Sequence, residues 1–291
     1  NLERASNLVD ASRLFRKPVY VMVDHSKFDA HVTTEHIKWT HQQYRRSIHN
    51  KLFNSVIKQT INNRCTTRQG IRYTVEGTRM SGDFDTALGN TMINYATLLY
   101  TLRQHKHHML IDGDDSVIIM ELTDATEEFM DRLLTNNRKM GFQSKIATTH
   151  LLSEVEFCQS KLIPTEPPRF GRNPLRALSK YSVTLKDYQG DARLRYLAGI
   201  GTCELAASAG VPILQTFATQ WSLASDKPMD IEELRVAYGK ATGTIPITDE
   251  VRAIFAEQWS IEPEEQVRIE SLIRTPSRVS TDTLRDQYVS E

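Results

Sequence analysis

The chain has 291 residues, of which 40% are hydrophobic and 25% charged, the composition of a globular protein with a sizeable core. Its 36 Lys and Arg residues balance 36 Asp and Glu residues, so no global positive field indicates a nucleic-acid partner, and any such binding has to come from local patches. The three cysteines lie far apart without a CxxC pair, which disfavours a structural zinc site and a disulfide framework and indicates a reducing compartment.

The first part of the chain predicts both strands and helices. Residues 18–24 form a short apolar run that ends in Asp24, as a buried strand does. From Thr33 onward apolar residues recur at helical spacing and predict an amphipathic helix, which residues 62–70 interrupt. Residues 71–75 alternate between apolar and polar side chains, the pattern of a half-buried strand.

A helix, an acidic hairpin and a second helix are expected next. Residues 86–102 carry no charge and predict a largely buried helix. Two apolar runs then flank an Asp-Gly-Asp-Asp sequence within residues 108–121, which predicts a hairpin with an acidic tip. Residues 124–140 have a helical apolar face, with Asp124 as the expected N-cap and Gly141 after the end.

The last part of the chain predicts mostly helices. Residues 155–163 indicate a short strand, residues 165–174 a loop, and a domain boundary is expected at residue 163. The helical segments expected beyond this loop are residues 191–208, 211–224, 230–240 and 248–258.

Two groups of acids are candidate metal ligands. Asp24 and Asp29 are five residues apart at the end of the first predicted strand. Either Asp24 ligates a hard divalent cation while Asp29 faces the same cleft, or one acid ends a strand and the other caps a helix. Taken alone, this pair favours the second interpretation.

The acidic hairpin tip favours a functional interpretation more strongly. An ordinary Asp-Gly turn explains Gly113 and one acid, but not the three acids Asp112, Asp114 and Asp115. Adjacent carboxylates beside apolar strands are costly unless a metal ion neutralises them. The hairpin tip therefore predicts a metal site.

Residues 77–90 connect a strand to a helix and contain the pattern SGxxxTxxxN, formed by Ser81, Gly82, Thr86 and Asn90. Thr86 and Asn90 share one helix face and could present a hydroxyl and an amide to a sugar. An N-cap serine before a buried helix explains the pattern equally well. With acid clusters on two separate strands, the whole arrangement fits phosphoryl transfer assisted by two metal ions.

The order of these motifs resembles a known family. D-x4-D, SG-x3-T-x3-N, GDD, a helix followed by KMGF, and EFCQSK are similar to palm motifs A to E of the RNA-dependent RNA polymerases of positive-strand RNA viruses. RMSGDFDTALGN and VEFCQ are most similar to the tombusvirus and carmovirus-like group, as are GRNPLRALSK and LAGIGTCELAASAGVPILQ. The resemblance covers roughly residues 18–216, and five motifs in order are highly specific.

The resemblance implies an α+β right-hand polymerase fold. We expect a palm over residues 1–163, built on an antiparallel sheet with helices behind it, with a fingers-side insertion around residues 31–76. A mostly helical thumb is expected over residues 164–291. The implied reaction is template-directed nucleotidyl transfer from a nucleoside triphosphate to an RNA 3′-hydroxyl, with template and product RNA as partners.

The same resemblance implies roles for individual residues. Asp24 and Asp114 correspond to the principal metal ligands, and Asp115 to an auxiliary acid near the metals. Mg²⁺ is the expected ion, because oxygen ligands and phosphates suit it, with Mn²⁺ as a possible substitute. The positions that bind the incoming nucleotide and sense its ribose 2′-hydroxyl are Asp29, Ser81, Gly82, Thr86 and Asn90.

Motifs D and E imply two further roles. Motif D supplies a cation that protonates the leaving pyrophosphate, and both Arg138 and Lys139 lie near that place. The sequence does not choose between them, and Lys139 is the one included among the candidate catalytic residues. A solvated helix end explains these two residues equally well. Motif E supports the primer strand and corresponds to Phe157, Cys158 and Gln159, with Cys158 expected to be a packed residue.

Charge is uneven along the chain. Residues 38–79 hold nine Lys or Arg residues and one acid, Glu76, whereas residues 224–291 hold fourteen acids and eight bases. The basic run is either a solvated face or an RNA contact, and its one-sided charge favours RNA. Its candidate RNA-binding residues are Arg45, Arg46, Arg68 and Arg72.

Few residues precede Asp24, whereas these polymerases have a long fingers region before motif A. We therefore expect a piece of a larger replicase, whose partners include the missing fingers or other replicase subunits. The sequence predicts no membrane span, so a membrane-associated replication complex in the host-cell cytoplasm would be held through other segments. The alternatives are a non-catalytic RNA-binding or replicase-assembly module and a reverse transcriptase, against which GDD and SGxxxTxxxN argue.

Overall fold

The computed structural model describes residues 2–181, 183–184, 186–238 and 243–275. The chain divides into two compact units, one formed by Asn7–Cys158 and the other by Gln159–Glu291 together with Asn1–Ser6. The division falls a few residues before the expected boundary at residue 163. It also falls within α1 (Leu2–Ser12), a helix that the sequence analysis did not predict.

The first unit is built on a four-stranded antiparallel sheet in the order β4-β5-β1-β6. Its strands are β1 (Pro18–His25), β4 (His107–Asp112), β5 (Asp115–Glu121) and β6 (Ser144–Thr149). The predicted strand over residues 18–24 and the predicted hairpin with an acidic tip are confirmed.

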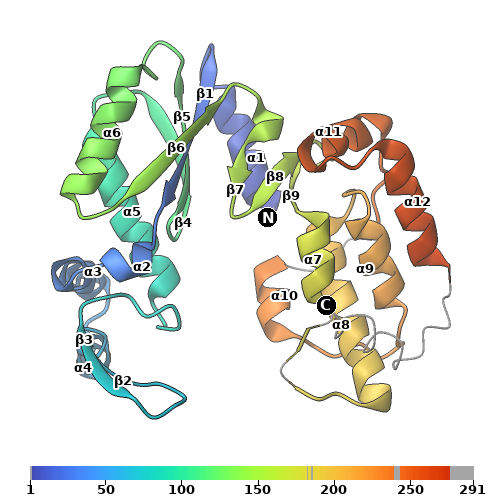
Figure 1. Ribbon diagram of the computed structural model, residues 1–291, viewed down its shortest axis with the longest axis horizontal. Helices are drawn as coiled ribbons and strands as arrows, with labels where there is room; N and C mark the ends of the chain where they lie inside the picture. The colour runs from blue at the N-terminus through green and yellow to red at the C-terminus, as the bar shows by residue number, and fades with distance from the viewer. Residues whose placement is uncertain (1, 182, 185, 239–242, 276–291) are drawn as a thin grey trace. The chain divides into compact units, whose positions relative to one another are not determined.

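Two helices, α5 (Thr86–Leu102) and α6 (Glu127–Lys139), cover one face of this sheet (Figure 1). Both were predicted, but the N-cap of α6 is Thr126, whose side chain accepts a hydrogen bond from the backbone N–H of Phe129. The expected cap Asp124 precedes the helix, because its backbone N–H bonds to Glu121 in a turn. The core between sheet and helices comprises Val19, Val21, Val23, Leu98, Leu102, Ile118, Met120, Phe129 and Leu133.

A group of smaller elements continues from the end of β1 and appears below the sheet in Figure 1. Its elements are α2 (Phe28–His31), α3 (Thr34–Ser47), α4 (Lys51–Lys58), β2 (Asn62–Thr66) and β3 (Arg72–Glu76). The predicted helix after Thr33 is confirmed, and the Thr33 side chain caps it.

One strand of this group was not predicted, and one expectation was wrong. Residues 62–70 interrupt the helical segments as expected, but residues 62–66 form β2, which pairs along its whole length with β3. Strand β3 was expected to be half-buried, but most of its side chains are exposed, and Tyr73 is 50% exposed. The alternation of apolar and polar residues therefore predicted the strand correctly but not its exposure to solvent.

The predicted strand over residues 155–163 is also wrong as a single element. It consists of β7 (Glu156–Phe157), which ends the first unit, and β8 (Ser160–Ile163), which begins the second. Cys158 and Gln159 separate them with φ angles of 52° and 57°, a left-handed conformation that a strand cannot contain.

The predicted loop over residues 165–174 contains a strand instead. Strand β9 (Arg169–Arg172) pairs antiparallel with β8, and this pairing satisfies the backbone of a segment that has weak local strand propensity. Gly171 allows the close approach, since a Cβ there would lie 2.7 Å from the side chain of Ile163.

The rest of the second unit is helical. The four predicted segments are confirmed as α8 (Gly190–Ser208), α9 (Leu214–Ser222), α10 (Glu232–Tyr238) and α11 (Asp249–Trp259). The last two residues of the segment predicted over 230–240 lie outside the described residues. Helices α7 (Pro174–Tyr181) and α12 (Pro263–Arg274) were not predicted.

Helices α8 and α9 approach each other closely at a glycine. A Cβ on Gly201 would lie 2.3 Å from the backbone nitrogen of Ser222, so a larger residue would force the helices apart. No helix in the described part of the chain is long and apolar enough to cross a membrane.

Candidate active site

The acids of the two candidate motifs lie on neighbouring strands of the first unit. Val23 of β1 pairs with Ser116 of β5, and Asp112 of β4 pairs with Asp115 of β5. Extending the first pairing by one residue places Asp24 opposite Asp115. Paired residues point to the same face of a sheet, and successive residues of one strand point to opposite faces. Because Val23 faces the helices, Asp24 faces the other side of the sheet, together with Asp115 and Asp112.

This acid row, Asp112, Asp115 and Asp24, produces a strongly negative local field. The pKa of Asp115 is raised to about 6, first by burial and then by the neighbouring carboxylates of Asp114, Asp24, Asp112 and Glu156. The structure therefore brings Asp24 and Asp114 into one electrostatic cluster, although ninety residues of sequence separate the two predicted metal ligands.

The donor set suits a hard cation that also has ligands from outside the protein. In the part of the chain that the structure describes, no group of three or more His, Cys, Asp or Glu side chains is arranged to hold a metal ion. Mg²⁺ is commonly held by one or two carboxylates, with water and substrate phosphates completing its octahedron. The carboxylates of Asp24 and Asp114, both exposed, fit this kind of site.

A second cluster surrounds Asp29 in α2. Ser81 Oγ donates a hydrogen bond of 2.6 Å to Asp29 Oδ2, and Asn90 Nδ2 donates one of 2.6 Å to Asp29 Oδ1. Asn90 is buried, and its Oδ1 has no hydrogen-bond partner among the described residues. Three of the five residues expected at the nucleotide ribose therefore meet.

The other two residues of that set are arranged differently. Thr86 Oγ1 donates to the carbonyl oxygen of Met80 at 2.7 Å, so this hydroxyl closes the loop that precedes α5. Gly82 is exposed, and a Cβ there would meet no described atom within 4 Å. Neither residue contacts Asp29 through a hydrogen bond recorded in this structure, and their roles at the nucleotide stay predictions.

A buried ion pair fixes the loop between β3 and α5. Arg79 Nη1 donates to both carboxylate oxygens of Asp85 at 2.8 Å, and Tyr44 of α3 donates to Asp85 Oδ2 at 3.1 Å. The Arg79 backbone N–H also donates to the Asp29 carbonyl oxygen at 3.0 Å. Arg79 was counted in the basic run, but the buried guanidinium is held inside the protein and cannot contact RNA there.

The predicted motif D cation, Lys139, lies on the helix side of the sheet. It lines a cavity of about 530 Å³ formed by α5, α6 and the segment after α5, and none of the predicted acids is among its described lining residues. Lys145 of β6 instead pairs with Asp24 and extends the acid row by one strand. Sequence analysis missed Lys145 because β6 itself was not predicted.

The motif E residues lie at the end of the first unit and the start of the second. Phe157 is buried, and Cys158 Sγ donates to Asp112 Oδ2 at 3.7 Å, so its thiol packs beside the acid row. This contact agrees with a packed rather than a reactive cysteine. Gln159 is exposed and belongs to the second unit, and support of a primer by these residues stays a prediction.

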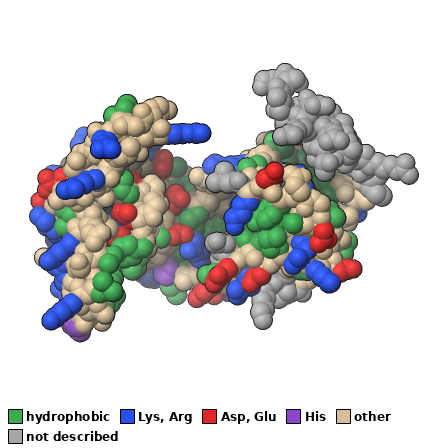
Figure 2. Space-filling view, turned by 90° about the horizontal axis from the view of Figure 1, so that it is seen from below, with side chains coloured by type: hydrophobic (Ala, Val, Ile, Leu, Met, Phe, Trp, Pro, Cys, Tyr) green, Lys and Arg blue, Asp and Glu red, His purple; other side chains and the backbone are tan. Residues whose placement is uncertain are grey.

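The predicted RNA-binding arginines lie on α3 and on the β2–β3 hairpin. Arg45 is partly buried and its Nε donates to Asn54 Oδ1 at 2.9 Å, which links α3 to α4. Arg46, Arg68 and Arg72 are exposed. Figure 2, which views the molecule from below, shows Lys and Arg side chains spread over this part of the surface with hydrophobic side chains between them.

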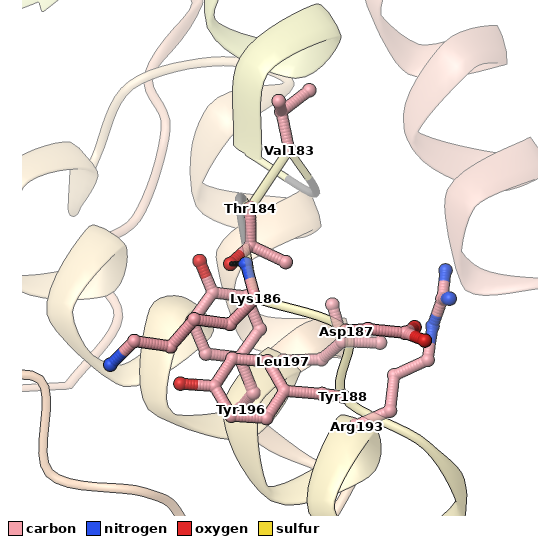
Figure 3. Close-up of a pocket in the computed structure, with 8 residues that line it drawn as sticks. All are labelled: Val183, Thr184, Lys186, Asp187, Tyr188, Arg193, Tyr196 and Leu197. Carbon is pink, nitrogen blue, oxygen red and sulfur yellow. Dashed lines mark hydrogen bonds between the residues drawn. The ribbon is translucent and has the colours of Figure 1, made fainter.

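A separate cavity of about 330 Å³ lies in the second unit (Figure 3). It is formed by the segment before α8 and by α8 itself, and Tyr188 and Tyr196 stack in it with ring centroids 4.7 Å apart. None of the residues predicted to act in catalysis or binding is among its described lining residues. The candidate active site is therefore the acid row with the Asp29 cluster.

Comparisons with known proteins identify the family of this chain. The family model described as "Viral RNA dependent RNA polymerase" matches residues 1–277. The chain is 29% identical to an RNA-directed RNA polymerase of Oat chlorotic stunt virus, over 95% of the chain and 40% of that protein. It is 30% identical to the one of Turnip crinkle virus, over 88% of the chain and 35% of that protein.

The enzyme named RNA-directed RNA polymerase of Groundnut rosette virus is also 30% identical, over 70% of the chain and 25% of that protein. The chain thus spans two-fifths or less of the length of these three relatives. The match to the family model nevertheless covers both units, from the first strand through the last described helix. The chain belongs to the family of viral RNA-dependent RNA polymerases.

Proposed function

We propose that this chain carries the catalytic part of an RNA polymerase that replicates a positive-strand RNA genome. The reaction is template-directed transfer of a nucleotidyl group from a nucleoside triphosphate to an RNA 3′-hydroxyl, with release of pyrophosphate. The observation that carries this proposal is the acid row, in which Asp24 lies beside Asp115 on the neighbouring strand, while Asp114 precedes Asp115 in the hairpin turn. The names of the relatives support the same reaction.

The proposed subdomains follow from the two units. The four-stranded sheet with α5 and α6 is the palm, the segment around residues 31–76 is its fingers-side insertion, and residues 164–291 are the thumb. The support for this assignment is the position of the acids on the sheet face that α5 and α6 leave free.

Asp24 and Asp114 would hold divalent ions, with Mg²⁺ as the proposed species and Mn²⁺ as a substitute, and Asp115 would add negative charge beside them. When bound, such ions would stabilise the charge that develops on the attacking and leaving oxygens. The contribution of the protein is to keep the carboxylates on one rigid sheet, where their positions change little as the substrate enters.

Asp29 would recognise the sugar of the incoming nucleotide. Ser81 and Asn90 each donate a hydrogen bond to one of its two oxygens, so the carboxylate is held in one orientation. A carboxylate that is held in this way has remaining lone pairs that can accept a hydrogen bond from a ribose 2′-hydroxyl. A deoxyribonucleotide has no hydroxyl to offer there.

Lys145 is the cation that we propose for protonation of the leaving pyrophosphate, in place of Lys139. Its strand position next to Asp24 puts an ammonium group on the same sheet face as the acids. Lys139 lines the cavity between α5 and α6 instead. Proton donation by a lysine near a negatively charged leaving group is a general acid step.

The test of the proposed function is primer extension by the intact polymerase with Asp114 changed to Asn. Removing one charge from the metal site should raise the barrier by about 4 kcal/mol, or lower the rate roughly a thousandfold, while the fold is retained. Asp124→Asn, the same change in the turn before α6, is the matched control and should extend primers like the wild type. A folded Asp114→Asn variant with full activity would remove Asp114 from the metal site.

The same assay separates the alternatives. A protein that binds template RNA but incorporates no nucleotide would be a non-catalytic RNA-binding or replicase-assembly module. Incorporation of deoxyribonucleotides in preference to ribonucleotides would indicate a reverse transcriptase.

A further inference from the structure

A buried asparagine holds the turn that carries Asp114. Asn94 of α5 is completely buried, and its Nδ2 donates to the carbonyl oxygens of Gly113 and Asp114 at 3.2 and 3.0 Å. One turn earlier on the same helix, Thr91 Oγ1 accepts a hydrogen bond of 2.8 Å from the backbone N–H of Gly113. Three backbone groups of a two-residue turn are therefore bonded to one helix.

The asparagine is itself held by a series of hydrogen-bonded polar side chains, of which His25 and Asn137 are buried and Ser144 is partly buried. Asn94 Oδ1 lies 3.0 Å from His25 Nε2, and the other ring nitrogen, His25 Nδ1, lies 2.9 Å from Ser144 Oγ. Ser144 Oγ in turn accepts a hydrogen bond of 3.0 Å from Asn137 Nδ2 of α6. His25 directly follows Asp24 in β1, so this series joins the strand of one proposed metal ligand to the turn of the other.

The donor and the acceptor of each hydrogen bond in this series can be assigned by starting from the carbonyl oxygens of Gly113 and Asp114. The two carbonyl oxygens can only accept, so the Asn94 amide nitrogen faces them and its oxygen faces His25. That oxygen also can only accept, and the proton therefore lies on His25 Nε2. In the neutral ring Nδ1 is then an acceptor, which the Ser144 hydroxyl satisfies as donor while its oxygen accepts from Asn137.

We propose that His25 is a positioning residue of the polymerase site: through Asn94 it sets where the Gly113–Asp114 turn lies relative to Asp24. This inference rests on the proposed function in one respect only, namely that Asp24 and Asp114 bind the metal ions. Without a donor at His25 Nε2, the Asn94 amide can rotate about its last bond and release the two carbonyl oxygens. The Asp114 side chain then loses its fixed distance to Asp24.

Residues that hold metal ligands in place through hydrogen bonds affect metal affinity and activity measurably. Their replacement commonly weakens metal binding or activity about 10- to 100-fold, although they touch neither metal nor substrate. The Asp29 cluster is not part of this chain of hydrogen bonds. The effect should therefore appear in metal affinity and kcat, and the KM for the nucleotide should change little.

The experiment compares His25→Phe with His25→Gln in the intact polymerase. Gln can place an amide donor near the position of His25 Nε2, whereas Phe has a ring of similar size and no donor. Mn²⁺ is titrated into each protein without RNA or nucleotide, and free Mn²⁺ is measured by electron paramagnetic resonance. We expect the dissociation constant to rise about 10- to 100-fold for His25→Phe, with most of the affinity restored in His25→Gln.

Two further variants keep the test decisive if His25→Phe does not fold. Asn94→Ala removes the donors to the turn and should weaken Mn²⁺ binding to a similar extent. Asn136→Ala is its matched control, because it removes an amide hydrogen bond of 2.9 Å between α6 and Thr101 of α5 without involving the turn. Mn²⁺ affinity should be unchanged in that control.

The outcomes separate this inference from the proposed function. If folded His25→Phe and Asn94→Ala bind Mn²⁺ like the wild type, the positioning role is wrong, whether or not the wild type polymerises RNA. If their Mn²⁺ affinity falls as expected but the wild type extends no primer, the positioning role holds and the proposed reaction fails. Equal losses in His25→Phe and His25→Gln would also overturn the role of the Nε2 donor.

Discussion

Asn90 of α5 donates a hydrogen bond of 2.6 Å to the carboxylate of Asp29 in α2, across sixty-one residues of sequence. Ser81 donates to the other oxygen of the same carboxylate. The side-chain oxygen of Asn90, Oδ1, is buried and has no hydrogen-bond partner among the described residues. This arrangement holds Asp29 and leaves a hydrogen-bond acceptor beside it, as expected of a site that distinguishes two sugars by one hydroxyl.

Asn90→Ala should therefore relax the preference for ribonucleotides. A lost hydrogen bond to a buried polar group costs about 1 to 3 kcal/mol, which corresponds to roughly 5- to 150-fold in discrimination. The measurement is single-nucleotide incorporation of matched ribo- and deoxyribonucleoside triphosphates, with Asn136→Ala as the control. If both efficiencies fall by the same factor and the ratio is unchanged, Asn90 is only a buried helix residue.

Lys145 and Lys139 are the two candidates compared for the role of the proton donor to pyrophosphate. General acids typically contribute about 10²- to 10⁴-fold, so Lys145→Ala should reduce kcat by a factor in this range and Lys139→Ala should have little effect. Pre-steady-state incorporation rates are needed, because product release can hide a change in the chemical step. The opposite order of effects would return the role to Lys139 and its helix end.

The raised pKa of Asp115 predicts an unusual pH dependence of stability. The ordinary pKa of this carboxyl is 3.8 and the folded value is about 6, so folding favours its protonated form. Its contribution is fully favourable below about pH 4 and is lost as the pH rises through about 6. In metal-free buffer, Asp115→Asn should therefore unfold at a higher temperature than the wild type above about pH 6.

That advantage should disappear toward about pH 4 and should shrink when Mn²⁺ is added to the wild type, because a cation bound by the acids stabilises their charged forms. Thermal unfolding followed by circular dichroism measures both effects. A variant that is less stable than the metal-free wild type at neutral pH would show that the fold does not disfavour the charged form of Asp115.

The exposed arginines should determine part of the salt dependence of RNA binding. For single-stranded RNA, each phosphate contact contributes about 0.7 to the slope of log K against log salt. Replacing Arg46, Arg68 and Arg72 by Gln should therefore reduce the magnitude of that slope by about 2. Arg13→Gln, which removes an exposed arginine paired with Asp10, is the control. An unchanged slope in the triple variant would mean that these side chains form a solvated face.

Periodicity predicted the elements that have a strong local pattern. The apolar run of β1, the uncharged α5 and the acidic β4–β5 hairpin were all found, because burial on one or both faces leaves a regular pattern in the sequence. Strands β2, β6 and β9 were missed, because all three are stabilised by pairing with a partner strand and contain polar or charged residues. Local propensity carries little information about such pairing.

The site residues also divide into those that a local sequence pattern indicates and those that only the tertiary structure reveals. Motif order alone indicated Asp24, Asp114, Asp29 and Asn90 as functional residues, since each belongs to a short pattern with a chemical reason. Lys145 belongs to no pattern, and only the pairing of β6 with β1 places it next to Asp24. Arg79 shows the reverse case, because its sequence position suggested RNA contact and its buried pairing with Asp85 excludes it.

The sequence by itself determined the family and the residue types of the site, because the spacing of acids, hydroxyls and amides is set by the chemistry they perform. The tertiary structure decided which of those side chains meet, and it alone revealed the chain of hydrogen bonds from Asn137 through His25 to the Asp114 turn. Such contacts depend on strand register and helix packing between distant segments. They therefore produce no periodic pattern within any single segment of the sequence.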